Sequence, residues 1–427
     1  MEARFQKLKP RPGYAGRRVE AHQRRRLHAA TIDLVSRGGY ESLSVTSIAR
    51  TAGVANRTFY ENFRGKEECF LATYDLIVRG AAREIFAAQH REQDLRAKVE
   101  AGFVAYLRTV AENPKAAYLA LLDAPCVPGS ATLIDHTTRL FESLVSTMFR
   151  TASTPVELPP LFARAIVGGL HQIANSHLLN GPEDHPSRDA ARLADWVMSL
   201  GVDTADCLSP TRLGVAVAVP PEPFPGNRPV NPAEDDRQII LRAVVKLATE
   251  EGYGSLSIPR IRSSAGISRR RFEEHFISVD ECFLSALAHH ADRIVSTRWT
   301  PSANGGGWSG GVFRALTFVC RDLAEDSSLS NLLFGEVRNA GDKATRWRVD
   351  SIARLGSSLR ASAPPESRPS ALAAEASIAA VWSLLEASAA QGRAQGLAQL
   401  AGPAAYLILA PAIGAGAAVE VVSHRNN

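Results

Sequence analysis

The chain has 427 residues, of which 45% are hydrophobic, and this apolar content suffices for buried cores in roughly two to four domains. Lys and Arg number 49 against 44 Asp and Glu, a formal net charge of only +5. The five cysteines are widely scattered and form no CxxC pair, which argues against a disulfide framework and a cysteine zinc site and fits a reducing cytoplasm.

Positive charge is concentrated at the start of the sequence. Residues 1–26 hold nine Lys or Arg against Glu2 and Glu20, the opposite of an apolar signal segment. We therefore expect residues 1–23 to form a flexible basic arm that can reach phosphate groups. A merely solvated tail is the alternative interpretation.

The next segment predicts three helices separated by short turns. In HAATIDLVSRGG, apolar side chains recur at helical spacing until a Gly-Gly pair ends the helix. Ser44 precedes VTSIARTA as an N-cap, and Gly53 permits the tight turn that follows. In ANRTFYENF, Phe59 and Phe63 lie one turn apart and point inward. This is the helix-turn-helix (HTH) plan, whose last helix enters the major groove of DNA.

The outward face of that third helix carries side chains that suit nucleic acid. Arg and Asn make paired hydrogen bonds with guanine and adenine edges, and Thr, Tyr and Lys commonly hold phosphates. A three-helix unit with ordinary polar surface is the alternative, although polar surface alone does not require the glycine turn or the paired phenylalanines. The candidate DNA contacts are Asn56, Arg57, Thr58, Tyr60, Asn62 and Lys66.

LSVTSIARTAGVANRTFYENFRGKEECF closely resembles the DNA-binding domain of the tetracycline-repressor (TetR/AcrR) family of bacterial regulators. The resemblance implies double-stranded operator DNA and a small-molecule effector as partners, and a repressor, with activation as the alternative. It also places Ser44 and Thr46 among the DNA contacts. The family usually caps the third helix with Ser or Thr, whereas this sequence has Ala55, at a cost on the order of 1 kcal/mol unless Asn56 caps instead.

The same pattern occurs a second time. RGGYESLSVTSIARTAGVANRTFYENFRGKEECFL, from Arg37, aligns without a gap with EEGYGSLSIPRIRSSAGISRRRFEEHFISVDECFL, from Glu250. We therefore predict an all-α chain of two tandem TetR-like units, each an HTH domain followed by a helical ligand-binding and dimerisation domain. The expected divisions are the basic arm 1–23, an HTH domain 24–78, a helical domain 79–208, a Pro-rich linker 209–234, a diverged HTH domain 235–291 and a second helical domain 292–427.

The second copy differs at the positions expected to face DNA. Ser268 restores the cap, but Tyr60 is replaced by Glu273, a carboxylate that repels the DNA backbone. Neighbouring arginines offset this charge, so the copy either reads a different half-site or has become mostly structural; we expect retained DNA contact. Its candidate contacts are Arg260, Arg269, Arg270, Arg271 and His275.

Two HTH units in one chain permit two assemblies. The halves can pair within the chain as a pseudo-twofold monomer, or two chains can form a dimer that displays four HTH units. The apolar helices near LADWVMSL and AAYLILA are candidates for the interface between halves. The second of these is broken by Pro403 and Pro411, so we expect a buried helix and no membrane span.

The helical remainder of each unit offers few functional signals of its own. By resemblance it encloses an effector pocket, for which the candidates are Phe103, Tyr106, Tyr118, His171 and Asn175, with His177 and Trp382 as further possibilities and ordinary core or surface as the alternative. No nucleophile elbow, HExxH motif or dinucleotide fingerprint occurs, so we expect no enzyme, cofactor or metal. The opposing class is a protein-interaction or structural helical module in which the second HTH no longer binds DNA.

Overall fold

The computed structural model describes residues 15–127, 129–181, 185–201, 235–298, 307–391 and 394–423, and these residues form helices and no strand. The all-α prediction is confirmed. The helices of the first half are α1 (Ala15–Gly38), α2 (Val45–Ala52), α3 (Asn56–Asn62), α4 (Lys66–Gln89), α5 (Leu95–Glu112), α6 (Pro114–Tyr118), α7 (Ala131–Arg150), α8 (Pro160–Asn180) and α9 (Pro186–Ser199), with the short turns η1 (Tyr40–Ser42), η2 (Leu119–Asp123) and η3 (Ala124–Cys126).

The second half runs through a comparable series of helices. They are α10 (Asp236–Glu251), α11 (Ile258–Ala265), α12 (Arg269–Glu273), α13 (Val279–Arg298), α14 (Gly307–Glu325), α15 (Ser327–Ser330), α16 (Val337–Asn339), α17 (Gly341–Ser362), α18 (Ala371–Ala390), α19 (Ala394–Ala398), α20 (Ala401–Ile413) and α21 (Ala415–Ser423), with the short turns η6 (Tyr253–Ser255), η7 (Asn331–Glu336) and η8 (Pro365–Ser367). We call α1 to α3 the first head and α10 to α12 the second head. Each head is a long helix, a single turn and two short helices in the same order.

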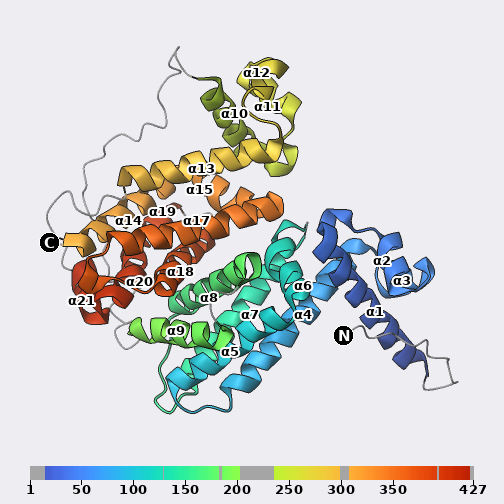
Figure 1. Cartoon of the computed structure of the whole chain (residues 1–427), viewed down its shortest axis with the longest axis horizontal. Coiled ribbons are helices and arrows are strands. Elements are labelled where there is room, and N and C mark those ends of the chain that lie inside the picture. Colours follow the sequence, from blue (N-terminus) through green and yellow to red (C-terminus); the bar gives the residue numbers. More distant parts are fainter. Residues whose placement is uncertain are drawn as a thin grey trace.

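Four helices, two from each half, pack together in what we call the central bundle: α8, α9, α18 and α20. The two heads lie apart from each other and away from this bundle, the first at the right of the view and the second at the top (Figure 1). The interface between halves therefore uses the two apolar helices that the sequence predicted, α9 and α20. It also uses α8 and α18, which make its most extensive contact.

The central bundle is held by close packing and by buried hydrogen bonds between the halves. Trp196 of α9 donates through Nε1 to Oγ of Ser377 at 3.0 Å, and the hydroxyl of Tyr406 donates to the carbonyl oxygen of Leu200 at 2.6 Å. All three of Trp196, Ser377 and Tyr406 are buried, so neither bond competes with water. The contact between the two halves is thus a buried core and not a solvated surface contact.

Two segments of the second half are long and apolar enough to cross a membrane by length and composition alone, Ala371–Ala390 and Gly396–Ile413. Both belong largely to α18 and α20 and pack against α8 and α9 of the first half. Pro411 lies inside α20, near its end. Their apolar character is accounted for by burial in the central bundle.

Two of the expected divisions need comment. Residues 15–23 of the expected flexible arm are helical, because α1 begins at Ala15, so the arm prediction is wrong there; residues 1–14 lie outside the described residues. The expected boundary between residues 78 and 79 falls inside α4, because α4 is one continuous helix that runs from the first head into the expected helical domain. Residues 209–234, the expected linker, also lie outside the described residues.

Candidate nucleic-acid interface and ligand cavity

The first head is built on two phenylalanines of α3. Phe59 and Phe63 are buried, with ring centroids 5.8 Å apart, and they pack against Leu27 and Ile48 of α1 and α2 in one apolar core. The edge of the His28 ring meets Phe63 at 5.5 Å between centroids. Each buried Phe contributes about 2 kcal/mol by burial alone, which fixes the rotation of α3 and so decides which side chains face outward.

The turn between α2 and α3 requires glycine. Gly53 has φ 62°, in the left-handed region, and ends α2 as its C-cap. Arg26 of α1 donates through Nη2 to the Gly53 carbonyl oxygen at 3.0 Å, and a Cβ on Gly53 would stand 2.4 Å from that nitrogen. The start of α2 is fixed by a capping box, in which the hydroxyl of Ser44 accepts from the Ser47 amide and Ser47 accepts from that of Ser44.

Three of the predicted contacts stand fully outward on α3: Asn56, Arg57 and Tyr60. The Arg57 side chain is 90% exposed and Tyr60 is 60% exposed. Arg57 donates through Nε to Glu61 at 3.1 Å, an exposed pair within one helix that contributes little and that a phosphate or a guanine can replace. This edge of α3 is free to meet a groove.

The other predicted contacts of the first head are placed differently. Thr46 is exposed on α2, whereas the exposed Ser44 already uses its hydroxyl in the cap. Thr58 is half-buried, and Asn62 turns its amide back to donate to the Thr58 carbonyl oxygen at 2.8 Å. Asn62 is therefore engaged with its own helix and is less available to a base than its sequence position suggested.

Lys66 occupies the first position of α4, directly after the turn that follows α3. Its ammonium lies 4.5 Å from the centroid of the Tyr40 ring, a cation–π contact that holds the side chain beside the head. The helix N-terminus beneath it adds further positive potential, because its first amide groups have no partner inside the helix. Lys66 and α4 thus suit a phosphate of the DNA backbone.

The third helix of the first head lacks a side-chain cap, as its sequence suggested. Ala55 is the N-cap residue, and its side chain has no acceptor for the unpaired amides at the start of α3. Asn56 does not cap the helix in its place. In the second head, Ser268 at the matching position accepts from the Arg271 amide at 3.3 Å.

We therefore expect Ala55→Ser to stabilise α3 by about 1 kcal/mol, because a serine hydroxyl would accept from an otherwise unpaired amide. Hydrogen exchange of the α3 amides would then slow about fivefold. Ala55→Val, which adds bulk but no acceptor, is the matched control and should not slow exchange. Equal protection in both variants would contradict this account of the cap.

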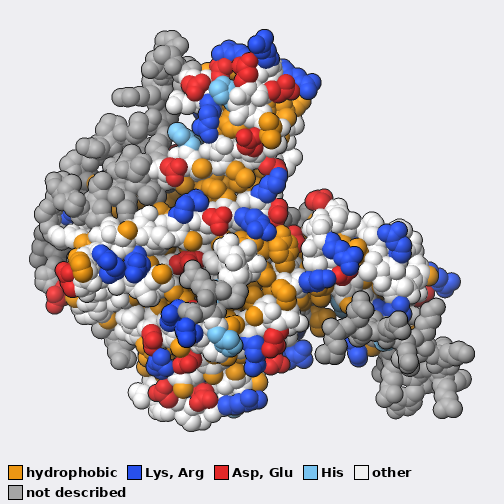
Figure 2. Space-filling model, viewed as in Figure 1, with side chains coloured by type: hydrophobic (Ala, Val, Ile, Leu, Met, Phe, Trp, Pro, Cys, Tyr) orange, Lys and Arg blue, Asp and Glu red, His pale blue; other side chains and the backbone are white. Residues whose placement is uncertain are grey.

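The predicted arginine contacts of the second head are all ion-paired. Each of the four predicted arginine contacts is ion-paired with a carboxylate of the head itself, and none is left uncompensated. The pairs are Arg260–Glu251, Arg269–Glu273, Arg270–Glu274 and Arg271–Asp236. Acidic and basic side chains lie side by side over this upper head, whereas Lys and Arg prevail on the visible face of the first head (Figure 2).

Two further features separate the second head from the first. His275 is half-buried against Phe276, at 6.5 Å between ring centroids, so it does not project as a free contact. Ile277 is 85% exposed at the position that Arg64 holds in the first head. An apolar side chain where a cation is expected adds nothing to phosphate binding.

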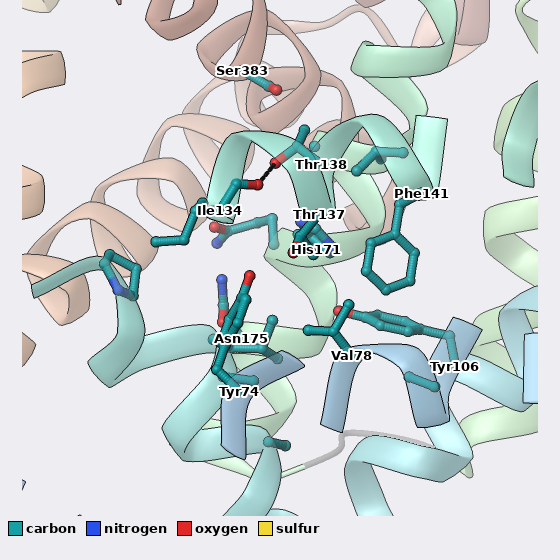
Figure 3. A pocket seen from close by; sticks show the side chains of 18 of the residues that line it. Tyr74, Val78, Tyr106, Ile134, Thr137, Thr138, Phe141, His171, Asn175 and Ser383 are labelled. Atoms are coloured by element: carbon teal, nitrogen blue, oxygen red, sulfur yellow. Dashed lines mark hydrogen bonds between the residues drawn. The ribbon is translucent and has the colours of Figure 1, made fainter. Parts of the chain in front are cut away.

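A cavity of about 1040 Å³ lies behind the first head, between α4, α5, α7 and α8 of the first half and α17 and α18 of the second. Of the predicted effector contacts, Tyr106, His171 and Asn175 line it (Figure 3). Phe103 packs in the core, and Tyr118 lies outside the cavity, which corrects the prediction for these two. Of the further candidates, Trp382 lines the cavity from the second half. The other, His177, instead pairs with Asp189.

The cavity has a mixed lining. Val78, Ile134 and Phe141 turn apolar side chains toward its centre (Figure 3). Burial, and then the charge of Arg348, lower the pKa of His171 to about 4, and burial raises the pKa of Tyr106. Both rings are therefore neutral near pH 7. Among the described residues, no group of three or more His, Cys, Asp or Glu is placed to hold a metal ion.

Sequence reasoning missed the part of this cavity that the second half supplies. Val337, Arg338, Thr345, Arg348, Ile352 and Ser383 all line it from beyond residue 330. Helical spacing within one segment carries no signal for a partner nearly 200 residues away. Only the duplication itself, which brings two comparable halves together, indicated that such a shared surface would exist.

Asp123, at the end of η2, connects the cavity side of the molecule with the first head. A Cβ on Gly39 would lie 3.6 Å from its Oδ1, while its Oδ2 has no hydrogen-bond partner. Burial, and then the charge of Asp342 in α17, raise the pKa of this carboxyl to about 7. Since the folded state prefers the neutral acid, stability from this group is present at low pH and is lost as pH rises from about 4 to about 7.

We expect Asp123→Asn to increase the free energy of unfolding by about 2 kcal/mol at about pH 8, because the amide removes a buried charge without changing shape. Urea unfolding of the two proteins at about pH 5 and about pH 8 measures the effect. The gain should be clearly smaller at the lower pH, where the folded carboxyl already holds its proton. The same gain at both values would show that the carboxyl does not titrate in this range.

Comparison with known proteins agrees with the geometry of the first head. Residues 27–73 match the family model of the bacterial regulatory proteins of the tetR family. The matched residues lie in the first head and the start of α4, so this part of the chain matches the DNA-binding domain of that family. No curated protein matches the chain.

Several solved structures resemble part of the chain. The fatty acid degradation regulator FadR of Bacillus halodurans is 16% identical with a TM-score of 0.36, over 44% of this chain and 96% of its own. FadR of Bacillus subtilis in complex with stearoyl-CoA is 15% identical with a TM-score of 0.36, over 40% and 96%. A TetR-family regulator of Marinobacter aquaeolei VT8 is 20% identical with a TM-score of 0.33, over 42% and 96%.

Proposed function

We propose that the chain is a ligand-responsive repressor that binds double-stranded operator DNA with α3 in the major groove. The observation that carries this proposal is the outward edge of α3, where Asn56, Arg57 and Tyr60 are exposed on a helix fixed by two buried phenylalanines. A rigid helix with free polar side chains is what base recognition needs. In a regulator of bacterial type this places the protein in the cytoplasm with the nucleoid.

We also propose that the chain acts as two tandem TetR-like units paired within one molecule. The central bundle supports this arrangement, because α8 and α18 occupy comparable positions in the two halves and pack on each other. An intramolecular pair needs no second chain to set the distance between its two heads. On this proposal the effector domains are residues 79–208 and 292–427, and the two heads face an operator of unequal halves.

The second head has a different role in this proposal. Glu273 stands at the position of Tyr60 and Ile277 at that of Arg64, so the second head offers DNA a carboxylate and an apolar side chain where the first offers a phenol and a cation. Arg57 of the first head and the four arginine contacts predicted for the second head are all ion-paired, so pairing alone does not separate the two heads. We infer that the first head reads bases and that the second contributes weak backbone contact. This is closer to the alternative of a second copy that has become mostly structural than to that of one that reads a different half-site.

The effector response can reach the DNA through α4. This helix begins at Lys66 beside α3, and two to three turns later its Tyr74 and Val78 line the cavity. A molecule in the cavity that tilts α4 would move Lys66 relative to α3. A few ångströms of displacement at a helix end suffices to take a phosphate contact out of hydrogen-bond range.

Selection of bound duplexes from a random pool, at a fixed salt concentration, tests the proposed function. One enriched half-site is expected, with a flanking segment whose sequence is unconstrained. Two enriched half-sites of unlike sequence would restore base reading to the second head. If no sequence is enriched, the regulator proposal fails and the protein-interaction alternative takes its place.

A further inference from the structure

The cavity described above holds one cationic side chain that makes no hydrogen bond or ion pair within the described part of the chain. Four other arginines line it, and each has its own carboxylate. The four pairs are Arg108–Glu112, Arg139–Asp135, Arg164–Glu142 and Arg338–Glu386. Arg348 of α17 also lines it but makes no hydrogen bond or ion pair with any residue that the structure describes.

Arg348 is held where its charge is costly. The residue is half-buried, and burial is the first cause that lowers the pKa of its guanidinium, followed by the opposing effects of Glu386 and Arg338. An arginine nevertheless stays protonated at physiological pH, so the cavity permanently contains this charge. A charge taken out of water without a partner destabilises the protein unless something supplies the missing anion.

Neutral donors on the same cavity also have no partner. The indole Nε1 of Trp382 and the hydroxyl of Tyr106 are buried without a hydrogen bond, and both residues line the cavity. Buried donors of this kind are normally satisfied, by protein, by water or by a ligand. Together with Arg348 they give the lining three donor side chains without a partner, beside two unpaired acceptors, Gln172 Oε1 and Asn175 Oδ1.

The rest of the lining is mixed, with apolar side chains among polar and acidic ones such as Glu84 and Asp135. Val78, Ile134 and Phe141 project into the space from α4 and α7 (Figure 3), and Ile352 lines it from α17. At about 1040 Å³ the cavity is at the upper end of the usual range for small-molecule sites. It therefore has room for a molecule with an apolar body of ten or more carbon atoms, roughly, as well as a polar head.

We propose that this cavity binds an amphipathic carboxylic acid whose ionised head pairs with Arg348 and whose apolar body lies among the side chains of α4 and α7. The guanidinium belongs to the second half and the apolar wall to the first, so the bound molecule bridges the two halves. This assignment rests on the proposed ligand response for its biological consequence, but binding itself does not depend on DNA.

Isothermal titration of the full chain, without DNA, with four probes of equal chain length provides the test. The probes are dodecanoate, dodecan-1-ol, the dodecyltrimethylammonium ion and dodecyl phosphate, each below its solubility or micelle limit. We expect dodecanoate to bind about tenfold or more tightly than the alcohol, and the cation to bind most weakly. An alcohol that binds as tightly as the acid, or a cation that binds best, would overturn the proposal. If dodecyl phosphate bound more tightly than dodecanoate, the proposed carboxylate head would be wrong and a phosphate head would take its place.

Variants at Arg348 locate the effect. Arg348→Gln should reduce dodecanoate affinity about tenfold or more and leave the alcohol unchanged, while Arg348→Lys should retain a preference for the acid. Arg79→Gln, at an arginine of α4 that is paired with Asp75 and does not line the cavity, is the matched control and should change neither affinity. Unchanged dodecanoate binding by folded Arg348→Gln would contradict the proposal.

If Arg348→Gln does not fold, the comparison of the probes on the unaltered chain still decides the question. Failure of the ligand proposal can also be told apart from failure of the proposed function. A chain that enriches an operator but shows no preference for the acid refutes only the ligand class. A chain that binds the acid but enriches no DNA refutes only the regulator.

Discussion

An Arg57→Glu, Lys66→Glu variant is expected to bind the selected operator at least about a hundredfold more weakly than the unaltered chain. Arg57 stands 90% exposed on the edge of α3 that we propose enters the groove, and Lys66 lies at the start of α4, where we expect a backbone phosphate. Each substitution removes an attraction and adds a carboxylate that repels the DNA. Equilibrium binding over a series of salt concentrations measures both the loss and the flatter salt dependence that accompanies fewer phosphate contacts.

The matched control is the pair Arg269→Glu, Arg270→Glu in the second head. Glu273 already stands where Tyr60 stands in the first head, so we expect the second head to contribute little and the loss to be less than about tenfold. Near-unchanged circular dichroism would show that both double variants are folded; Arg57, Arg269 and Arg270 are exposed, and Lys66 is half-buried. A larger loss from the second head than from the first would reverse the roles given to the two heads.

The first head was predictable because its determinants lie close together in the sequence. A cap at Ser44, a left-handed turn at Gly53 and two inward rings at Phe59 and Phe63 are all local choices, and each has the predicted conformation or burial. Local propensity, turn chemistry and apolar spacing agree there on a single arrangement. The missing cap at Ala55 was likewise visible from residue type alone.

The state of the second head was only partly visible in the sequence. Arg269 and Glu273, like Arg270 and Glu274, stand four residues apart, a spacing that favours ion pairs on one helix face. That signal was present and argued against free arginines. The pair of Arg271 with Asp236 was not visible in this way, because α10 and α12 must first pack together.

The cavity was the least predictable feature, for a physical reason. Aromatic residues of α5 and α8 are equally suited to a core and to a pocket, and only packing decides between them. Tyr106 lines the cavity, whereas Phe103, three residues earlier on the same helix, is sealed in the core. Arg348 enters from the other half of the chain, so its role depends on how α8 and α18 bring the halves together.

That contact between α8 and α18 depends on two glycines, and replacing both is expected to weaken it severely. A Cβ on Gly168 would stand 2.5 Å from the Ser383 Cβ, and one on Gly169 would stand 2.6 Å from the Trp196 ring. The carbonyl oxygens of Ala379 and Ala376 lie 3.2 and 3.1 Å from the same two Cβ positions. Because packed side chains and helix backbone both stand too close, neither added methyl group has space.

We expect Gly168→Ala, Gly169→Ala to lower the free energy of unfolding by about 2–5 kcal/mol, since overpacking at a rigid contact costs about 1–3 kcal/mol at each site. Gly80→Ala in α4 is the matched control, because a Cβ there meets nothing within 4 Å and alanine favours a helix by up to about 1 kcal/mol. The same chemical change should therefore destabilise at the central bundle and stabilise in α4, as urea unfolding would show. If both variants gained stability, α8 and α18 would not be in close contact, and a fixed spacing between the two heads would lose its structural basis.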